Sequence, residues 1–406
     1  MTDDMRPEVF SRGRLRALVL GVLLASGADA AAQHQPFTVH DTKPVITNGP
    51  YLVGMSETSV MVVWSTDTPS HSRVLFGADG ALDRVAEPAE HGMVPVATQH
   101  AVLIDRLEPG RTYQYQVEST RVVKLKAYWP EKGLAIKGPL STFKTFDRSA
   151  AATSFSVVTD THEDIGRINA LMKLIDWPRN DFLVHTGDAF HWIDSEDQLV
   201  RNWLMPTAQA LAHAKPLLYA RGNHDLRGPF ARELIKYVPA PEGRFYYARD
   251  HGPVHLLVVD TCEDKADETN VYARLNRCKA YREEELAWFE QHARTAERVR
   301  TAPFRIVVMH QPNWGWVDGQ NAKWTEMANR AGVDLVIAGH RHRFSHVKPG
   351  EQGNDYHLVV VGQDQVATVD ATSQVLKIAV RGKDGPAVSA IEIPVRQRES
   401  PGRSDR

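Results

Sequence analysis

The segment Phe155-Ser156-Val157-Val158-Thr159-Asp160-Thr161-His162 introduces a pattern that recurs along this chain. A short β-branched or apolar run, which suits a buried strand, is followed at once by side chains of the kinds that bind metal ions. Four further runs, at residues 182–184, 216–219, 304–308 and 333–337, precede in order Gly187-Asp188, Gly222-Asn223-His224-Asp225, His310 and Gly339-His340-Arg341-His342. In open α/β sheets the functional crevice lies beyond the carboxyl ends of the strands. We therefore expect these side chains to converge on one site.

The residue types in these motifs indicate a site for two metal ions. Imidazole and carboxylate ligands favour Zn, Fe or Mn over Ca and Mg, which prefer shells of oxygen alone. One carboxylate can touch both ions and hold them about 3.5 to 4 Å apart, a separation suited to in-line displacement at phosphorus. Asp188 is our candidate for this bridge. Each motif is weak evidence by itself, and their order and setting carry the prediction of a two-metal hydrolase.

Two patterns divide the rest of the chain. Residues 41–147 look all-β, with strand-like runs at 60–64 and 113–117 and turn residues at short intervals. The segment from Leu107 to Tyr113 resembles the corner of a fibronectin type III-like sandwich, with Tyr113 as the corner tyrosine and Trp64 as a core aromatic.

After a small-residue linker at 147–152, strands alternate with helical segments, which predicts an α/β region over 153–395. The expected helices are 165–175, 197–214 and 282–298, and the expected late strands are 356–361, 365–369, 374–380 and 387–393. Residues 396–406 are polar and are predicted to be a disordered tail.

The composition is that of an ordinary globular protein with an export signal. The 406 residues carry a formal net charge of −2 and no dense basic run within the predicted domains, so nucleic acid and anionic membrane surfaces are not suggested as partners. Arg12, Arg14 and Arg16 precede an apolar run at 17–25 and small residues at 28–32, a pattern typical of a secretory signal peptide over residues 1–32. The apolar run is far shorter than the ~20 residues that span a bilayer, which disfavours the alternative of a stable membrane anchor. We expect a periplasmic or secreted protein.

The only two cysteines, Cys262 and Cys278, would enter an oxidising compartment with such a leader. We predict that they pair and enclose the polar segment 263–277, with two free thiols as the alternative.

Together, the five motifs resemble the calcineurin-like metallophosphoesterase superfamily, whose pattern is D-x-H, G-D, G-N-H-D/E, H and G-H-x-H. With the preceding β region, which opens on Gly49-Pro50-Tyr51-Leu52, the chain further resembles the purple acid phosphatase architecture. The resemblance implies an N-terminal all-β sandwich followed by a four-layer αββα catalytic domain. It also implies that the substrate is a small-molecule phosphate ester.

The resemblance also implies a role for each motif residue. One metal ion would be held by Asp160, His162, Asp188 and His342, and the other by Asp188, Asn223, His310 and His340. His224 would act on the phosphate as a general acid or transition-state stabiliser, oriented by Asp225, while a metal-bound hydroxide attacks phosphorus. For Asp225, capping of the following helix is the alternative.

One position departs from the purple acid phosphatase pattern. Those enzymes have a tyrosine ligand three residues after the bridging aspartate, the source of their colour, and His191 stands here instead. His162 would supply the missing ligand, so we predict a site without a tyrosinate charge-transfer band. His191 itself is a supporting residue or a substrate contact. Four aromatic residues are candidates either for walling the site or for packing of loops and core: Trp192, Tyr246, Trp314 and Trp316.

Other functions fit parts of this pattern. A phosphodiesterase or nucleotidase could use the same metal site, because the motifs do not fix the number of ester arms. A catalytically inactive binding protein would have no reason to keep the full ligand set and His224. Binuclear hydrolases of the lactamase or amidohydrolase type resemble patterns that begin with H-x-H, whereas here D-x-H comes first and H-x-H last. From the resemblance to purple acid phosphatases we expect phosphate monoester hydrolysis, with a phosphodiesterase or nucleotidase as the alternative.

Overall fold

The computed structural model describes residues 37–240, 242–315, 317, 319–385 and 387–396. The predicted leader, the predicted tail beyond residue 396 and Trp316 lie outside these residues. From Thr38 onward the described chain forms one compact unit. Within the described residues no helix is both long enough and apolar enough to cross a membrane.

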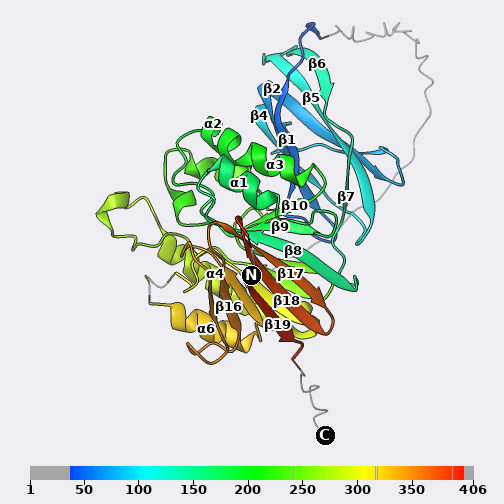
Figure 1. Ribbon diagram of the computed structural model, residues 1–406. Coiled ribbons are helices and arrows are strands. Elements are labelled where there is room, and N and C mark those ends of the chain that lie inside the picture. The colour runs from blue at the N-terminus through cyan, green and yellow to red at the C-terminus, as the bar shows by residue number, and fades with distance from the viewer. Residues whose placement is uncertain (1–36, 241, 316, 318, 386, 397–406) are drawn as a thin grey trace, which may run out of the picture. The chain divides into compact units, whose positions relative to one another are not determined.

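The first sheet contains three of the predicted motif strands. Strands β8 (Ala152–Val158), β9 (Phe182–His185) and β10 (Pro216–Tyr219) run parallel and side by side. Beyond β8 the sheet continues antiparallel through β17 (Gln365–Thr372), β18 (Val375–Gly382) and β19 (Ala387–Pro394) (Figure 1). The motifs that follow β8, β9 and β10 therefore emerge at the same edge of one sheet.

The second sheet contains the other two motif strands. Its strands, in spatial order, are β11 (Tyr247–His251), β12 (Val254–Val258), β13 (Phe304–Val308), β14 (Leu335–Ala338), β16 (His357–Val360) and β15 (Ser345–Val347). Strands β12, β13, β14 and β16 are parallel. His310 follows β13, and His340 and His342 follow β14, so this sheet also presents its ligands at the carboxyl ends of its strands.

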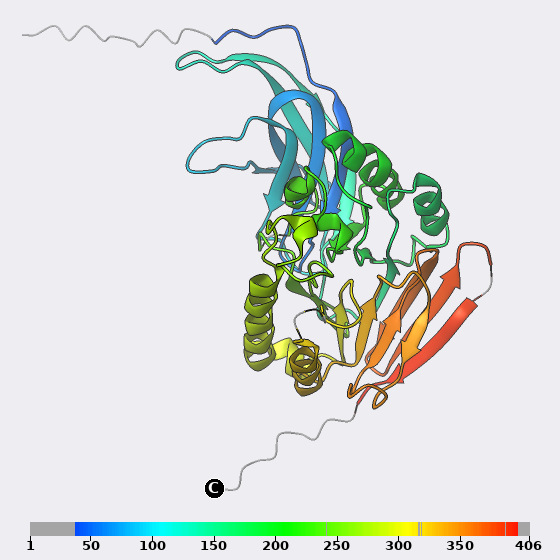
Figure 2. The same ribbon diagram turned by 90° about the vertical axis from the view of Figure 1, so that its left-hand side faces the viewer.

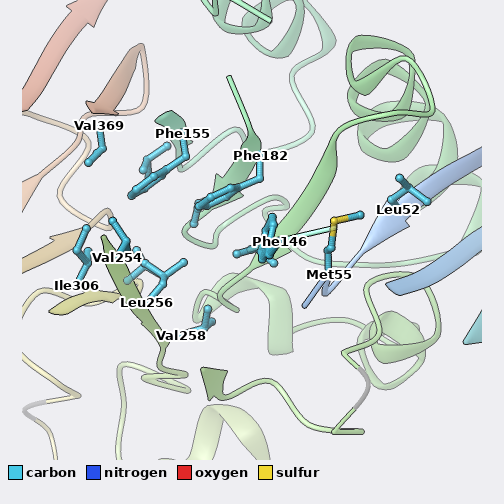
Figure 3. Close-up of a cluster of buried hydrophobic side chains, with 14 of the residues drawn as sticks. Leu52, Met55, Phe146, Phe155, Phe182, Val254, Leu256, Val258, Ile306 and Val369 are labelled. Carbon is cyan, nitrogen blue, oxygen red and sulfur yellow. The ribbon is translucent and has the colours of Figure 1, made fainter. Parts of the chain in front are cut away.

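Alternation along the strands explains why the two sheets pack face to face. In β9, Phe182 and Val184 point into the core between the sheets, whereas Leu183 points to the outer face. In β13, Ile306 points into the same inner core, and Val307 points outward. Figure 3 shows side chains of both sheets, among them Phe155, Phe182, Leu256 and Ile306, meeting in this core. Both faces of these strands are buried, which is typical of parallel sheets covered by helices.

Helices cover the outer face of each sheet. Helix α1 (Ile165–Met172) and the segment α2 (Glu196–Leu199), a π-helical turn (Val200–Leu204) and α3 (Met205–Leu211) pack on the first sheet. Helices α4 (Cys278–Thr295) and α6 (Asn321–Arg330) pack on the second, and Figure 2 shows them next to each other. The short α5 (Glu297–Thr301) follows α4, and 3-10 turns lie at His224–Leu226, Ala231–Lys236 and Asn270–Tyr272. The predicted αββα layering is confirmed.

All three helix predictions differ in detail from the structure. The expected helix 165–175 ends at Met172. The expected helix 197–214 is broken by the π-helical turn just before Pro206, a residue that has no N–H for a bond within the helix. The expected helix 282–298 begins earlier, at Cys278, and stops at Thr295 because Ala296 is extended.

The N-terminal strands join the first sheet. They are β1 (Ile46–Val53), β2 (Val60–Ala78), β3 (Arg84–Ala86), β4 (Ala97–Ile104), β5 (Thr112–Lys124), β6 (Glu131–Lys137) and β7 (Ser141–Lys144). Strand β1 pairs antiparallel with β2 and parallel with β10, so hydrogen-bonded pairing continues from the β region into the α/β region. The predicted boundary at 147 falls in the turn between β7 and β8.

The predicted tyrosine corner and core aromatic are confirmed. The Tyr113 hydroxyl accepts a hydrogen bond from the backbone N–H of Glu108 at 2.9 Å, which closes the corner before β5. Trp64 is fully buried and its Nε1 donates to Ser119 Oγ at 2.8 Å.

Candidate metal centre

Close packing of three glycines brings the motif loops together. A Cβ on Gly222 would lie 2.1 Å from the backbone nitrogen of Asp188, and one on Gly187 would lie 2.4 Å from the backbone nitrogen of Gly222. A Cβ on Gly339, in the loop after β14, would lie 1.9 Å from Thr159 Oγ1. Only glycine permits these approaches, so the glycines of the motifs set the distances between the ligands that follow them.

Most of the candidate ligands have a strained backbone. Five of the seven lie in the left-handed region, with φ of 52° at Asp160, 47° at His162, 52° at Asp188, 72° at His340 and 54° at His342. This conformation is uncommon for residues other than glycine and costs free energy that the surrounding structure must offset. Such strain concentrates at functional sites, where it aims side chains that an ordinary loop would direct elsewhere.

The first ligand group consists of Asp160, His162, Asp188 and His342, each of which offers one atom within 4.8 Å of the others. His342 Nε2 lies 3.3 Å from His162 Nε2 and 3.2 Å from Asp160 Oδ1. The other nitrogen of His162, Nδ1, lies 3.1 Å from the carbonyl oxygen of Phe190, which can only accept a hydrogen bond. This bond fixes the ring so that the unprotonated Nε2 faces the group, as in histidines that bind metal ions.

The second ligand group contains Asp188, His310 and His340. His310 Nε2 lies 3.1 Å from Asp188 Oδ2, and its Nδ1 donates to the carbonyl oxygen of Thr186 at 2.7 Å. Asp188 is therefore common to both groups. Asn223, the remaining predicted ligand, is completely buried in the loop that packs against Asp188.

Several buried atoms of these groups have no hydrogen-bond partner. They are Asp160 Oδ1, His310 Nε2, and both Oδ1 and Nδ2 of Asn223. The first two have only ion-pair contacts, with His342 and Asp188. Buried polar atoms without partners are uncommon in folded proteins, and these four lie among the oxygen and nitrogen donors of the two ligand groups. The donor set fits Zn, Fe or Mn.

The charges of the groups also fit bound cations. Burial opposes a charge on His310, yet the nearby negative charge of Asp188 raises its pKa to about 10. The two buried carboxylates thus draw positive charge to this point, a role that a metal ion would fill while leaving His310 neutral. Burial lowers the pKa of His162 and of His340 to about 4, which keeps both imidazoles in the neutral form that binds metals.

His224 lies at the edge of the centre, partly exposed. Its backbone N–H donates to Asp188 Oδ1 at 2.9 Å, and its ring Nε2 lies 4.0 Å from Asp188 Oδ2. The ring Nδ1 donates to the carbonyl oxygen of His191 at 2.8 Å. His224 is absent from both ligand groups that contain Asp188, although it forms a separate cluster with His162 and His191.

The structure differs from the expectation that Asp225 orients His224, because the Asp225 carboxylate contacts other groups. The buried carboxylate of Asp225 accepts hydrogen bonds from the backbone N–H groups of Gly222 at 2.8 Å, Asp188 at 3.0 Å and Phe190 at 3.3 Å, and from the Tyr219 hydroxyl at 2.6 Å. Burial and the neighbouring charge of Asp188 raise its pKa to about 7. Asp225 therefore ties the loops after β9 and β10 together, and the backbone of His191 orients His224. The alternative of a simple helix cap also does not describe this bridge between loops.

The remaining candidates separate into site and core residues. The exposed His191 ring stacks on His162 with centroids 4.3 Å apart, so it supports a ligand. Trp314 is buried against Trp324, and Tyr246 is buried with its hydroxyl bonded to Glu284, so both belong to the packing of the second sheet and its helices. Trp192 is about half exposed and bonds to Asp194.

Two charged residues beside His224 were missing from the sequence prediction. Arg227 Nη1 lies 3.0 Å from His224 Nε2, and the side chain of Arg227 is paired with Glu263. Arg227 lies two residues after the G-N-H-D motif, which is the one signal that could have drawn attention to it. Glu263 is 36 residues further along the chain and follows no motif.

Known proteins resemble this chain in sequence and in fold. A family model for calcineurin-like phosphoesterases matches residues 153–344, a range that includes all five motifs. Purple acid phosphatase 21 of Arabidopsis thaliana is 23% identical over 160 residues, which are 35% of this chain and 33% of that protein. The chain thus spans about a third of the length of this curated relative.

The likeness extends to a solved structure. Purple acid phosphatase PPD1 from seeds of yellow lupin (Lupinus luteus) superposes with a TM-score of 0.61 at 14% identity, covering 85% of this chain and 74% of that chain. At this level of identity the likeness shows the fold, including the combination of N-terminal strands with the α/β layers.

Proposed function

We propose that this chain, a metallophosphoesterase with a purple acid phosphatase-like architecture, is an exported two-metal hydrolase of phosphate monoesters. The observation that carries the proposal is the pair of ligand groups that share Asp188, with His224 at their edge. Two cations that share one carboxylate are suited to displacement at phosphorus.

The metal ions would be held by the seven residues named above, with Asp160, His162 and His342 on one side of Asp188 and Asn223, His310 and His340 on the other. When bound, such ions polarise phosphoryl oxygens and lower the pKa of water to about 7 in favourable zinc sites. The protein fixes the ligand rings through the carbonyl groups of Phe190 and Thr186. Fe, Mn and Zn all suit this donor set.

His224 is proposed to act on the phosphate or the leaving group. Because Nδ1 is engaged by the His191 carbonyl, Nε2 is the nitrogen that can hold a proton toward the substrate. A proton or hydrogen bond from this position would stabilise charge that develops as the ester bond breaks.

Metal analysis and two chromogenic esters test this proposal. The wild-type protein should bind two metal ions and hydrolyse p-nitrophenyl phosphate faster than its bis ester. His224→Ala should keep the metal and lose about 10²- to 10⁴-fold in rate, the usual contribution of a general acid. Faster cleavage of the bis ester would favour a phosphodiesterase, and an unchanged rate in His224→Ala would refute its role.

The proposed absence of a tyrosine ligand has its own test. His191 occupies the position of the purple-type tyrosine and stacks on His162. Protein loaded with ferric iron should show no strong visible band from an iron–phenolate bond, and such a band in the absorption spectrum would contradict the predicted ligand set.

Export is supported by the disulfide and by the leader pattern. Cys262 and Cys278 are bonded, as predicted, with Cα atoms 5.7 Å apart. Disulfides persist mainly in oxidising compartments. Mass spectrometry of the protein from the periplasm or medium should find a new N-terminus between Ala30 and Gln33, whereas an intact leader on membrane-bound protein would contradict export as a free protein.

A further inference from the structure

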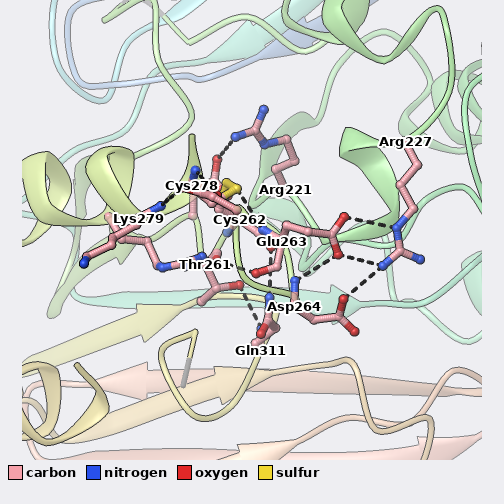
Figure 4. The surroundings of a disulfide bond; sticks show 12 residues. Arg221, Arg227, Thr261, Cys262, Glu263, Asp264, Cys278, Lys279 and Gln311 are labelled. Carbon is pink, nitrogen blue, oxygen red and sulfur yellow. Dashed lines mark hydrogen bonds and ion pairs between the residues drawn. A yellow bond between two sulfur atoms is a disulfide. The ribbon is translucent and has the colours of Figure 1, made fainter. Parts of the chain in front are cut away.

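Arg227 presents a fixed positive charge beside His224. Its Nε and Nη2 donate to the two carboxylate oxygens of Glu263 at 3.1 and 2.7 Å, and Nη2 also donates to Asp264 Oδ1 at 3.1 Å. Figure 4 shows this two-pronged pairing. One edge of the guanidinium is thereby occupied, and the remaining nitrogen, Nη1, faces His224 at 3.0 Å from Nε2 and 3.2 Å from Nδ1.

The partner of Arg227 is itself held in place. The Glu263 side chain is fully buried, whereas that of Arg227 is 22% exposed. The buried carboxylate therefore holds the partly exposed guanidinium in place. The backbone N–H of Glu263 lies 3.3 Å from Cys278 Sγ of the disulfide, and its carbonyl oxygen accepts from Arg282 on α4 at 3.2 Å. The disulfide and α4 therefore fix the position of Glu263 and, through it, that of the guanidinium.

The hydrogen-bonding groups of Arg227 and His224 indicate which kind of ligand can bind between them. The His191 carbonyl requires the proton of His224 to be on Nδ1, so Nε2 accepts from Arg227 Nη1 in the free protein. The guanidinium of Arg227 and the ring of His224 lie 3.0 Å apart at the edge of the metal ligands. An anionic phosphate can contact both at once, and arginine is well suited to phosphate oxygens.

We propose that Arg227 binds a non-bridging oxygen of the substrate phosphate and contributes to a preference for monoesters over diesters. The inference rests on the proposed phosphoesterase function and adds a substrate-binding residue outside the metal-ligand motifs. A monoester carries one more negative charge than a diester when fully ionised, so a fixed cation here stabilises the monoester complex more. Glu263 is a positioning residue, because it acts through Arg227.

Binding and kinetics of Arg227→Gln test the role. Affinity for inorganic phosphate, measured by calorimetry on metal-loaded protein, should fall about 10- to 100-fold, as expected for loss of a charge-assisted hydrogen bond. For p-nitrophenyl phosphate kcat/KM should fall by a similar factor, with a smaller fall for the bis ester, while the metal content stays at the wild-type value. Unchanged phosphate affinity, or equal losses for both esters, would overturn the proposal.

A second arginine supplies the matched control. Arg73 forms a comparable pair with the nearly buried Glu118, on β2 and β5, outside the metal centre. Arg73→Gln should change stability without changing phosphate affinity or the ratio of the two esters. If it reproduced the kinetic effect of Arg227→Gln, general destabilisation would explain both results and the proposal would be wrong.

Glu263→Gln tests the positioning role. The variant keeps the size of the side chain but weakens its pairing with Arg227, so its phosphate affinity should fall less than that of Arg227→Gln. The double variant should bind phosphate no more weakly than Arg227→Gln alone. Additive losses would contradict action through Arg227. Wild-type protein that binds metal but hydrolyses neither ester would reject the proposed function itself, whereas an active wild type with an unaffected Arg227→Gln rejects this inference alone.

Discussion

The metal centre and the region of β2, β4 and β5 around Trp64 both bury polar side chains, but they differ in how the buried polar atoms are paired. Around Trp64 the polar atoms are paired with one another: Trp64 Nε1 and Ser72 Oγ both contact Ser119 Oγ, and His100 Nε2 contacts Thr66 Oγ1 at 2.9 Å. In the metal centre, atoms of Asp160, Asn223 and His310 are buried without hydrogen-bond partners.

Two buried histidines express this difference most clearly. Burial, together with the neighbouring His71, lowers the pKa of His100 to about 4. For His310 the opposite holds, since the negative charge of Asp188, with Oδ2 3.1 Å from His310 Nε2, outweighs burial and raises the pKa to about 10. A satisfied polar cluster adds stability, whereas buried polar atoms without hydrogen-bond partners, next to charged groups, are typical of functional sites.

Removal of the shared carboxylate should have the largest effect. Asp188→Asn keeps the size of the side chain but removes the charge common to both ligand groups. We expect loss of metal from both sides, and a loss of phosphatase activity well beyond the roughly 10- to 100-fold typical of residues that only support ligands. Elemental analysis with the p-nitrophenyl phosphate assay measures both.

Asp197, an exposed acid on α2, is the matched control for Asp188. Asp197→Asn should leave metal content and activity unchanged. Retention of two metal ions by Asp188→Asn would show that the two ligand groups do not depend on a common residue, and the contrast with the satisfied cluster would lose its basis.

A clash between loops should have the next largest effect. In Gly222→Ala the new Cβ would meet the backbone nitrogen of Asp188 at 2.1 Å, so the two loops must separate. Overpacking of this kind costs about 1 to 3 kcal/mol, and we expect a lower melting temperature together with weaker metal binding. Calorimetric titration of metal into the apoprotein gives the metal affinity, and scanning calorimetry gives the melting temperature.

Gly382, at the end of β18, is the control for Gly222. A Cβ there would have no neighbour within 4 Å. Gly382→Ala should therefore leave metal affinity unchanged. If Gly222→Ala also bound metal as the wild type does, close approach of the loops would not be what sets the ligand positions.

The positions of the motif residues could be predicted from the sequence because each motif follows a strand that is recognisable by its apolar run. Asp160, Asp188 and Asn223 follow β8, β9 and β10, and strand ends in parallel sheets meet at one edge. The pairing of Cys262 with Cys278 was also predictable, since only two cysteines exist.

Contacts that depend on tertiary packing could not be predicted in this way. The family resemblance implied that Asp225 orients His224, but in the 3-10 turn the Asp225 carboxylate accepts hydrogen bonds from the backbone of Gly222 and Asp188. The Arg227–Glu263 pair spans 36 residues, and its geometry depends on the disulfide and α4. The pairing of β1 with β10 likewise joins segments that no local pattern relates.

The smallest predicted effect concerns the satisfied cluster and its response to acid. The pKa of His100 in the folded protein is about 4, below its ordinary value of 6.5, so between these values the unfolded chain binds a proton that the folded chain does not. The free energy of unfolding should therefore decrease as the pH falls from 6.5 toward 4, by at most about 3 kcal/mol from this residue.

His100→Gln removes this contribution while retaining a polar partner for Thr66. Urea unfolding at several pH values between 7 and 4.5 should thus show a difference between wild type and variant that shrinks as the pH falls. Losses shared by both proteins, including loss of metal in acid, cancel in that difference. A constant difference would mean that His100 titrates alike in the folded and unfolded chains, and the contrast between its environment and that of His310 would then not hold.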